Sequence, residues 1–249
     1  DVMRFLDNVL TDFIERAPEQ FDDAKYSAEK ERSVGLGVMG FHSYLQKHSI
    51  PLESVMSKAW NKKIFKHIQE HVDQASKDLA DERGACPDAA DYGYNERFSN
   101  KTAIAPTASI SIICGGASPG VEPVAANSYT HKTLSGSFNV RNRYLVELLE
   151  KHGKNTDDVW SGITTNQGSV SHLDFLTDLE KDVFKTAFEL DQKWIIELSG
   201  DRTPYISQAQ SINLFVPADI HKRELHKIHF DAWKKGLKSL YYCRSKSIQ

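Results

Sequence analysis

The stretch from Thr102 to Pro123, TAIAPTASISIICGGASPGVEP, restricts the possible folds of this 249-residue chain more than any other segment. A short apolar run meets Pro106, and alternating hydroxyl and apolar residues then lead into a segment with three glycines. This order predicts a buried strand followed by a tight loop with exposed backbone. Because small residues leave backbone N–H groups uncovered, such a loop can hold an anion without Lys or Arg. Composition alone favours the alternative, a Ser/Gly-rich connector.

The overall composition is that of an ordinary globular protein. Hydrophobic residues make up 40% and charged residues 26% of the chain, which excludes disorder and a membrane span. The net charge of −3, with scattered Lys and Arg, argues against a nucleic-acid polymer as partner. Cys86, Cys114 and Cys243 form neither a disulfide framework nor a CxxC metal site, so we expect a reducing, cytoplasmic location. We expect one structural unit over residues 1–249. The chain begins at Asp1 inside an amphipathic pattern, so we also expect a fragment.

Helical spacing of apolar residues predicts most of the elements. One helix is predicted from Met3 to Ile14 and a long one from Trp60 to about Gly84. His67 and His71, one turn apart on the long helix, are predicted on its solvated face, because no HExxH-type carboxylate accompanies them. Another helix is predicted over residues 138–149. The segment 155–169 is predicted to be a loop.

The C-terminal third alternates helical and strand patterns. Thr177 and Glu180 have the spacing of a capping box, and the helix that they open is predicted to continue to Leu198. Residues 211–216 read SINLFV and predict a strand. Asp219 is predicted to cap a helix that leads into the apolar segment 240–243, and its histidines are predicted at the surface. Short strands between long helices predict an α/β architecture.

Gly35, Gly37 and Gly40 match GxGxxG, the dinucleotide-binding pattern. The preceding residues, AEKERS, cannot form the buried parallel strand that this motif requires. Close backbone packing at these glycines is therefore the favoured interpretation. An NAD-dependent dehydrogenase stays open as a minor alternative.

Tyr241 and Tyr242 form the second candidate site. On a regular strand their side chains point to opposite faces, with one in the core and one outside. Two stacked phenols in a water-poor path can instead pass an oxidising equivalent, each losing an electron together with a proton. A phenol pKa near 10 keeps tyrosine neutral until that step.

Four segments together resemble the C-terminal part of the large, catalytic subunit of class I ribonucleotide reductase. They are RSVGLGVMGF, RGACPD, IAPTASIS with the downstream GVEP, and KSLYYCRS. The resemblance spans nearly all of the chain. It implies the C-terminal half of a ten-stranded α/β barrel with helices outside.

The resemblance also implies roles for particular residues. Tyr241 and Tyr242 would transfer a radical toward a catalytic cysteine, which favours class I over the cobalamin-dependent class. Substrate diphosphate would bind to six consecutive residues, Pro106, Thr107, Ala108, Ser109, Ile110 and Ser111. Ala108 and Ile110 can offer only their backbones, so amides and dipoles must neutralise most of the anion's charge.

The family's radical cysteine, with its flanking Asn and Glu, has no match in this chain, and Cys243 is not at the matching place. The resemblance therefore implies a fragment that is inactive alone and needs the N-terminal part of the large subunit. The other implied partners are the small subunit, which bears the metal-based radical, a ribonucleoside diphosphate, and a second large subunit in a homodimer. The chain itself is expected to bind no cofactor. A non-catalytic partner or scaffold module is the main alternative, with a connector at 106–111 and core tyrosines.

Overall fold

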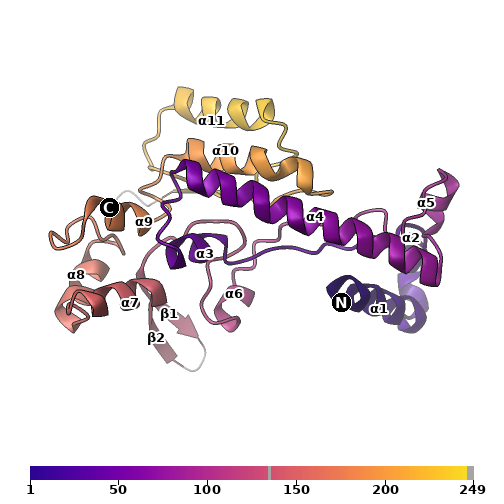
Figure 1. Cartoon of the computed structure of the whole chain (residues 1–249), viewed down its shortest axis with the longest axis horizontal. Helices are drawn as coiled ribbons and strands as arrows, with labels where there is room; N and C mark the ends of the chain where they lie inside the picture. The colour runs from indigo at the N-terminus through magenta and orange to yellow at the C-terminus, as the bar shows by residue number, and fades with distance from the viewer. Residues whose placement is uncertain (134–135, 246–249) are drawn as a thin grey trace. The chain divides into compact units, whose positions relative to one another are not determined.

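The computed structural model describes residues 1–133 and 136–245. Helices predominate in these residues and short strands appear only from Ser128 onward, so the chain is mixed α/β, as predicted (Figure 1). The chain divides into two compact units, which are described separately below. The first unit consists of Asp1–Gly37, Asn61–Ala105 and Asp201–Gln210, and the second of Val38–Trp60, Pro106–Gly200 and Ser211–Gln249.

The first unit is mainly helical. Its core joins the apolar face of the first helix to that of the longest one, through Met3 and Leu6 against Val72 and Leu79. Both helices are those predicted from apolar spacing, and the long one begins five residues earlier than expected. The helices of this unit are α1 (Val2–Arg16), η1 (Glu19–Phe21), α2 (Asp22–Glu31), part of α4 (Val55–Arg83), α5 (Pro87–Asp91) and η2 (Thr203–Tyr205).

Extended segments of the first unit pair in parallel at Leu36 with Thr102 and at Ile104 with Gln210. A Cβ atom at Gly37 would lie 2.5 Å from the carbonyl oxygen of Ala103, closer than real Cβ contacts allow. Glycine at this position therefore permits the two backbones to approach, as the favoured interpretation of the GxGxxG match predicts. The segment follows helix α2 directly, so no strand precedes Gly35 as a dinucleotide-binding turn requires.

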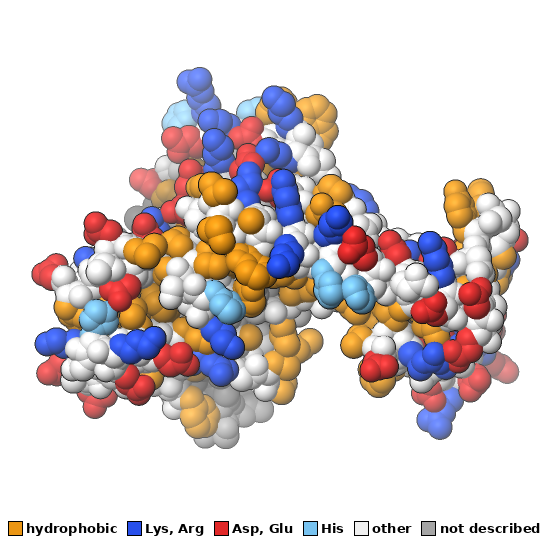
Figure 2. Space-filling view, viewed as in Figure 1, with side chains coloured by type: hydrophobic (Ala, Val, Ile, Leu, Met, Phe, Trp, Pro, Cys, Tyr) orange, Lys and Arg blue, Asp and Glu red, His pale blue; other side chains and the backbone are white. Residues whose placement is uncertain are grey.

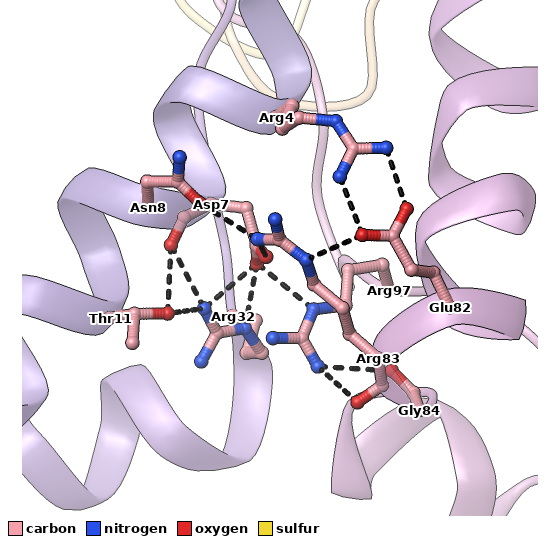
Figure 3. A network of polar contacts seen from close by, with 9 residues as sticks. All are labelled: Arg4, Asp7, Asn8, Thr11, Arg32, Glu82, Arg83, Gly84 and Arg97. Atoms are coloured by element: carbon pink, nitrogen blue, oxygen red, sulfur yellow. Dashed lines mark hydrogen bonds and ion pairs between the residues drawn. The ribbon is translucent and has the colours of Figure 1, made fainter.

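Asp7 on α1 is fully buried, and three arginines of the first unit surround it (Figure 3). Arg32 and Arg97 donate hydrogen bonds to Oδ1 at 2.8 and 2.9 Å, and Arg83 donates to Oδ2 at 2.7 Å. Burial disfavours the charged carboxylate, but the three guanidinium groups outweigh it and hold the pKa of Asp7 below its ordinary value. The cluster joins α1 to the ends of α2 and α4 and to the segment after α5.

The second unit contains the strands. A hairpin forms one antiparallel sheet, with Ser128 opposite Arg141, and a separate pair of strands is parallel. Its elements are α3 (Phe41–Lys47), α6 (Ile110–Ile113), β1 (Ser128–Thr133), β2 (Gly136–Arg141), α7 (Arg143–Lys151), α8 (Asp157–Thr165), α9 (Asp178–Val183), α10 (Gln192–Arg202, up to residue 200 in this unit), β3 (Leu214–Val216), α11 (Lys222–Lys234) and β4 (Cys243–Ser245).

The parallel pair β3 and β4 is joined by α11, which forms a β–α–β crossover. Leu214 of β3, Ile196 of α10 and Ala232 of α11 form one buried cluster, and the partly buried Ile228 of α11 packs against it. In Figure 1, α11 lies beside α10 at the top of the view. The helices therefore cover the outside of the parallel pair, as the resemblance implied.

Two predictions in the middle of the chain are wrong. The predicted helix over 138–149 begins only at Arg143, because Phe138 and Val140 alternate with polar residues and belong to strand β2. Asn142 then caps α7 by accepting the N–H of Tyr144 at 3.1 Å. The predicted loop at 155–169 contains α8. This short helix shows no long apolar repeat in the sequence, and packing of Trp160 in the core stabilises it.

Helix boundaries near the C-terminus also differ from the predictions. The capping box of Thr177 and Glu180 is present, but α9 ends at Val183. A new helix, α10, begins after Asp191, whose carboxylate accepts the N–H of Lys193 at 2.9 Å. The predicted single helix is thus two, separated by residues 184–191, where the N–H groups of Thr186 and Ala187 donate to Glu189 and Val124 instead of continuing the helix. His221, and not Asp219, caps α11.

The solvent face of α11 is charged. Figure 2 shows Lys and Arg side chains gathered over this helix, at the top of the view. His226 and His229 are exposed there, as are His67 and His71 on α4, so their predicted surface positions are confirmed. Among the helices in the described part of the chain, none is both long and apolar enough to cross a membrane.

Candidate functional site

The loop at Pro106–Ser111 is held by hydrogen bonds of Thr107. Thr107 has φ +52°, a left-handed conformation that β-branched residues rarely adopt. Its Oγ1 accepts the N–H of Gly120 at 2.7 Å, and its carbonyl oxygen accepts the N–H of Ser111 at 2.9 Å. The two bonds close the loop and offset the strain at Thr107.

The loop offers backbone donors more than side-chain donors. Ser111 is buried and its hydroxyl donates to the carbonyl oxygen of Ala108 at 3.1 Å, so that proton is used within the loop. Ala108, Ser109 and Ile110 are exposed, and no residue that the structure describes accepts a hydrogen bond from their N–H groups. Three consecutive free N–H groups and the hydroxyl of Ser109 therefore face solvent or a ligand.

A pocket of about 320 Å³ lies beside the loop in the second unit. Pro106 and Ala108 contribute one part of its lining, and Glu122, Asn213 and Arg244 contribute polar groups from GVEP, the residue before β3, and β4. Burial raises the pKa of Glu122, while hydrogen bonds from the side chain and the backbone N–H of Asn213 and the charge of Arg244 act in the opposite direction. The predicted loop and the strand that follows the tyrosine pair thus line the same pocket.

A second pocket, of about 410 Å³, also touches the loop at Ala108 and Ser111. Its other walls include Tyr129 and Val140 of the hairpin and Arg143 of α7. This lining is mostly apolar and contains no carboxylate, so the two pockets beside the loop differ in chemistry.

Tyr241 and Tyr242 lie just before β4, and their ring centroids are 4.1 Å apart at an angle of 52°. Both rings are about half exposed, at 50% and 54%. A hydrogen bond with the hydroxyl of Tyr242 raises the pKa of Tyr241. The two phenols are therefore in direct contact, and neither is in the core.

The backbone explains why both rings lie together. In a regular strand, consecutive N–H groups point to opposite sides. Here the N–H of Tyr241 donates to the carbonyl oxygen of Ile212 at 2.8 Å, and the N–H of Tyr242 donates to Oδ1 of Asn213 at 3.0 Å. Because both N–H groups turn toward the segment that enters β3, the alternation of side chains is lost.

Sequence reasoning missed three polar residues of this site, Glu122, Asn213 and Arg244. Glu122 stands in GVEP and Arg244 two positions after the tyrosines, but neither residue had a predicted role. The available signal was Asn213 itself, a polar residue inside the apolar strand pattern SINLFV. An amide on a buried strand needs a partner, and here that partner is the backbone of Tyr242.

The cysteines lie apart from this arrangement in different environments. Cys86 is fully buried at the start of α5, and its N–H donates to the carbonyl oxygen of Glu96 at 3.0 Å, which confirms a packed residue. Cys114 and Cys243 are exposed. Within the described ranges, no three His, Cys, Asp or Glu side chains gather as a metal site would require.

Parallel strands covered by helices, with a loop of free N–H groups beside them, place the chain in the α/β class with a candidate anion-binding loop. The chain belongs to the ribonucleotide reductase family, since that family's barrel domain matches residues 1–96 and 89–243. The resemblance stated from the sequence is thus confirmed.

The relatives are larger proteins. Ribonucleoside-diphosphate reductase large subunits of Invertebrate iridescent virus 6 and Invertebrate iridescent virus 3 are 51% and 46% identical over the whole chain, which spans 26% and 40% of them. The Actinobacillus ureae class Id ribonucleotide reductase alpha subunit is 40% identical with a TM-score of 0.91. That match covers 99% of this chain and 45% of the other. The chain therefore spans less than half the length of these proteins.

Proposed function

We propose that this chain is the part of a ribonucleoside-diphosphate reductase large subunit that binds the substrate diphosphate and transfers the radical. The observation that supports this most is the pocket of about 320 Å³. Residues of the loop and of the strand after the tyrosine pair line it together, so both functions are assigned to one unit of the chain.

The loop would bind the diphosphate through its free donors. The N–H groups of Ala108, Ser109 and Ile110 and the hydroxyl of Ser109 can each donate to a phosphate oxygen. Successive N–H groups in a turn form a concave site with partial positive charge, which suits an anion where no Lys or Arg is present in the loop. Thr107 and Ser111 would hold the shape of the loop and bind little of the anion by their side chains.

The tyrosine pair would transfer the radical by hydrogen-atom exchange. A phenoxyl radical on one ring takes one electron and one proton from the O–H of the other. The first tyrosine recovers its neutral phenol and the second becomes the radical. Contact between the rings supports this step, because proton transfer requires the two oxygens to be within hydrogen-bond reach.

Other proteins would supply the rest of the reaction. The N-terminal part of the large subunit would bring the catalytic cysteine and the remaining barrel strands, and the small subunit would start the transfer with its metal-based radical. The exposed residues of β4 support a missing neighbour, since an open strand edge is normally covered. In the full enzyme, two large subunits would form a homodimer.

Reconstitution tests this proposal. Mixed with the N-terminal part of the large subunit and with the small subunit, the chain should restore reduction of ribonucleoside diphosphates. Tyr241→Phe and Tyr242→Phe should each abolish turnover while substrate binding is unchanged, because Phe keeps the ring and lacks the O–H. Tyr92→Phe, at an exposed tyrosine of the first unit, is the matched control and should turn over normally.

Two results would count against the proposal. A correctly assembled complex without turnover would contradict the assignment as a reductase part and favour a scaffold module. Near-normal turnover of both tyrosine variants would remove radical transfer from the proposal and leave only substrate binding.

A further inference from the structure

The side chain of Asn213 binds the backbone of the tyrosine pair. It is 2% exposed, and its side-chain oxygen accepts the N–H of Tyr242 at 3.0 Å. Its neighbours continue the same attachment, because Ile212 accepts the N–H of Tyr241 and Leu214 donates to the carbonyl oxygen of Tyr242. Of these three hydrogen bonds, only the one from Tyr242 to Asn213 involves a side chain. The position of the Tyr242 N–H therefore depends on how the Asn213 side chain is held.

Glu122 holds Asn213 from the other side. The backbone N–H of Asn213 donates to Oε1 of Glu122 at 3.2 Å, and Glu122 is 6% exposed. A buried carboxyl oxygen that accepts a buried N–H is costly to remove, because the N–H is left without a partner. Glu122 and Asn213 together therefore define the position of the backbone at Tyr242.

The same short segment is attached to the diphosphate loop. Gly120, two residues before Glu122, donates its N–H to Oγ1 of Thr107 at 2.7 Å. A continuous path thus runs from Thr107 through Gly120 and Glu122 to Asn213 and Tyr242. Each step is a hydrogen bond or at most two residues of backbone. The position of the tyrosine relative to the loop is therefore restricted.

On the basis of the function proposed above, we propose that Glu122 and Asn213 are positioning residues that fix Tyr242 relative to the diphosphate loop. Neither residue exchanges the electron or proton itself. Their action is to keep the phenol of Tyr242 at hydrogen-bond distance from that of Tyr241 while the substrate is held on the loop. Radical transfer depends steeply on such distances, and a displacement of 1 Å can lower a rate about 100-fold.

Paired substitutions in the assembled enzyme test this inference. Asn213→Ala and Glu122→Met each remove one acceptor and should lower turnover roughly 10- to 100-fold. The Kd of the ribonucleoside diphosphate should change much less than turnover, because the free N–H groups of Ala108, Ser109 and Ile110 are kept. Glu122→Gln keeps the accepting oxygen in place and should restore most of the turnover.

Gln192→Met is the matched control. Gln192 is also buried, and its Oε1 accepts the N–H of Phe215 in strand β3 at 2.8 Å, but it does not contact Tyr242. This variant should melt at a lower temperature and keep its turnover. If Asn213→Ala does not fold, the Glu122 variants decide the question.

Three outcomes would overturn the inference. They are wild-type turnover in folded Asn213→Ala or Glu122→Met, equal damage by Glu122→Gln and Glu122→Met, and an equal loss in Gln192→Met. Failure of the proposed function looks different, because then the wild-type assembly has no turnover or Tyr242→Phe remains active.

Discussion

The buried carboxylate of Asp7 offers the sharpest test of how the first unit is held together. In Asp7→Asn the side chain keeps its shape and one oxygen, but three arginines lose the negative charge that they share (Figure 3). Removing one partner of a buried ion pair costs about 3–5 kcal/mol. The side chains of Arg83 and Arg97 remain 28% and 12% exposed, so water can partly solvate them. We therefore expect the lower end of this range, about 3 kcal/mol.

Thermal unfolding followed by circular dichroism measures this loss. In a chain of this size each 1 kcal/mol lowers the midpoint by about 2–4 °C, so we expect a fall of roughly 6–12 °C. Asp12→Asn is the control on the same helix. Its carboxylate pairs with Arg16 in solvent, and such a pair contributes about 0–1 kcal/mol. Equal midpoints for the two variants would refute the argument that the buried cluster stabilises α1.

The pH dependence has a definite sign. The folded-state pKa of Asp7 is lowered, so its charge stabilises the fold fully above the unfolded pKa of about 3.9. That stabilisation is lost as the pH falls through the folded pKa. The difference in unfolding free energy between wild type and Asp7→Asn should thus be full at neutral pH and shrink below about pH 4. A difference that is constant with pH would show that the charge is not its cause.

Substitutions at three further positions test local features. Gly37→Ala places a Cβ 2.5 Å from the carbonyl oxygen of Ala103 and should destabilise the chain by about 1–3 kcal/mol in urea unfolding; an unchanged midpoint would contradict the close approach. Thr177→Ala removes the capping box of α9 and should lower the free energy of unfolding by about 0.5–2 kcal/mol in the same assay. An unchanged free energy would show that the cap does not stabilise the chain. Ser109 has φ −86°, close to the φ that proline requires, so proline can replace it with little change of backbone. Ser109→Pro removes both the N–H and the hydroxyl, whereas Ser109→Ala removes only the hydroxyl. Calorimetry on the assembled enzyme should show weaker diphosphate binding for the proline variant, and equal affinities would exclude the backbone donor.

The parts of the fold that were predictable are those whose signal is long and local. In helices α1 and α4 apolar residues recur at helical spacing over several turns, and a loop rarely shows so long a repeat. Helix α8 has two turns, and its stability comes from burying Trp160 against α7, which is a tertiary contact. The break between α9 and α10 was hidden because the apolar pattern continues through it. The carboxylate of Asp191 caps α10 at the end of this break, and that of Glu189 binds Thr186 inside it.

The sequence predicts the loop and the tyrosine pair as candidate sites, but it does not indicate Glu122, Asn213 or Arg244, nor the hydrogen bond that joins Glu122 to Asn213. The loop and the tyrosine pair are short segments whose residue types suggest their chemistry. The hydroxyl of Ser111, expected as a donor to a ligand, donates within the loop instead. Glu122 and Asn213 lie 91 residues apart, so no spacing rule relates them and only the fold brings them together. Sequence patterns of short range therefore find the groups that do chemistry more readily than those that hold them.

Thr107 also limits which residues the loop can accept. A left-handed conformation at a residue other than glycine costs about 1–3 kcal/mol, and glycine would remove that cost. Glycine would also remove the oxygen that accepts the N–H of Gly120, and valine would keep the bulk without the oxygen. The side chains that satisfy both demands are short and bear an oxygen, with Asn and Asp the most tolerant of positive φ. We therefore expect position 107 to accept a residue only if its side-chain oxygen can reach the N–H of Gly120. The size or polarity of the side chain alone should not decide.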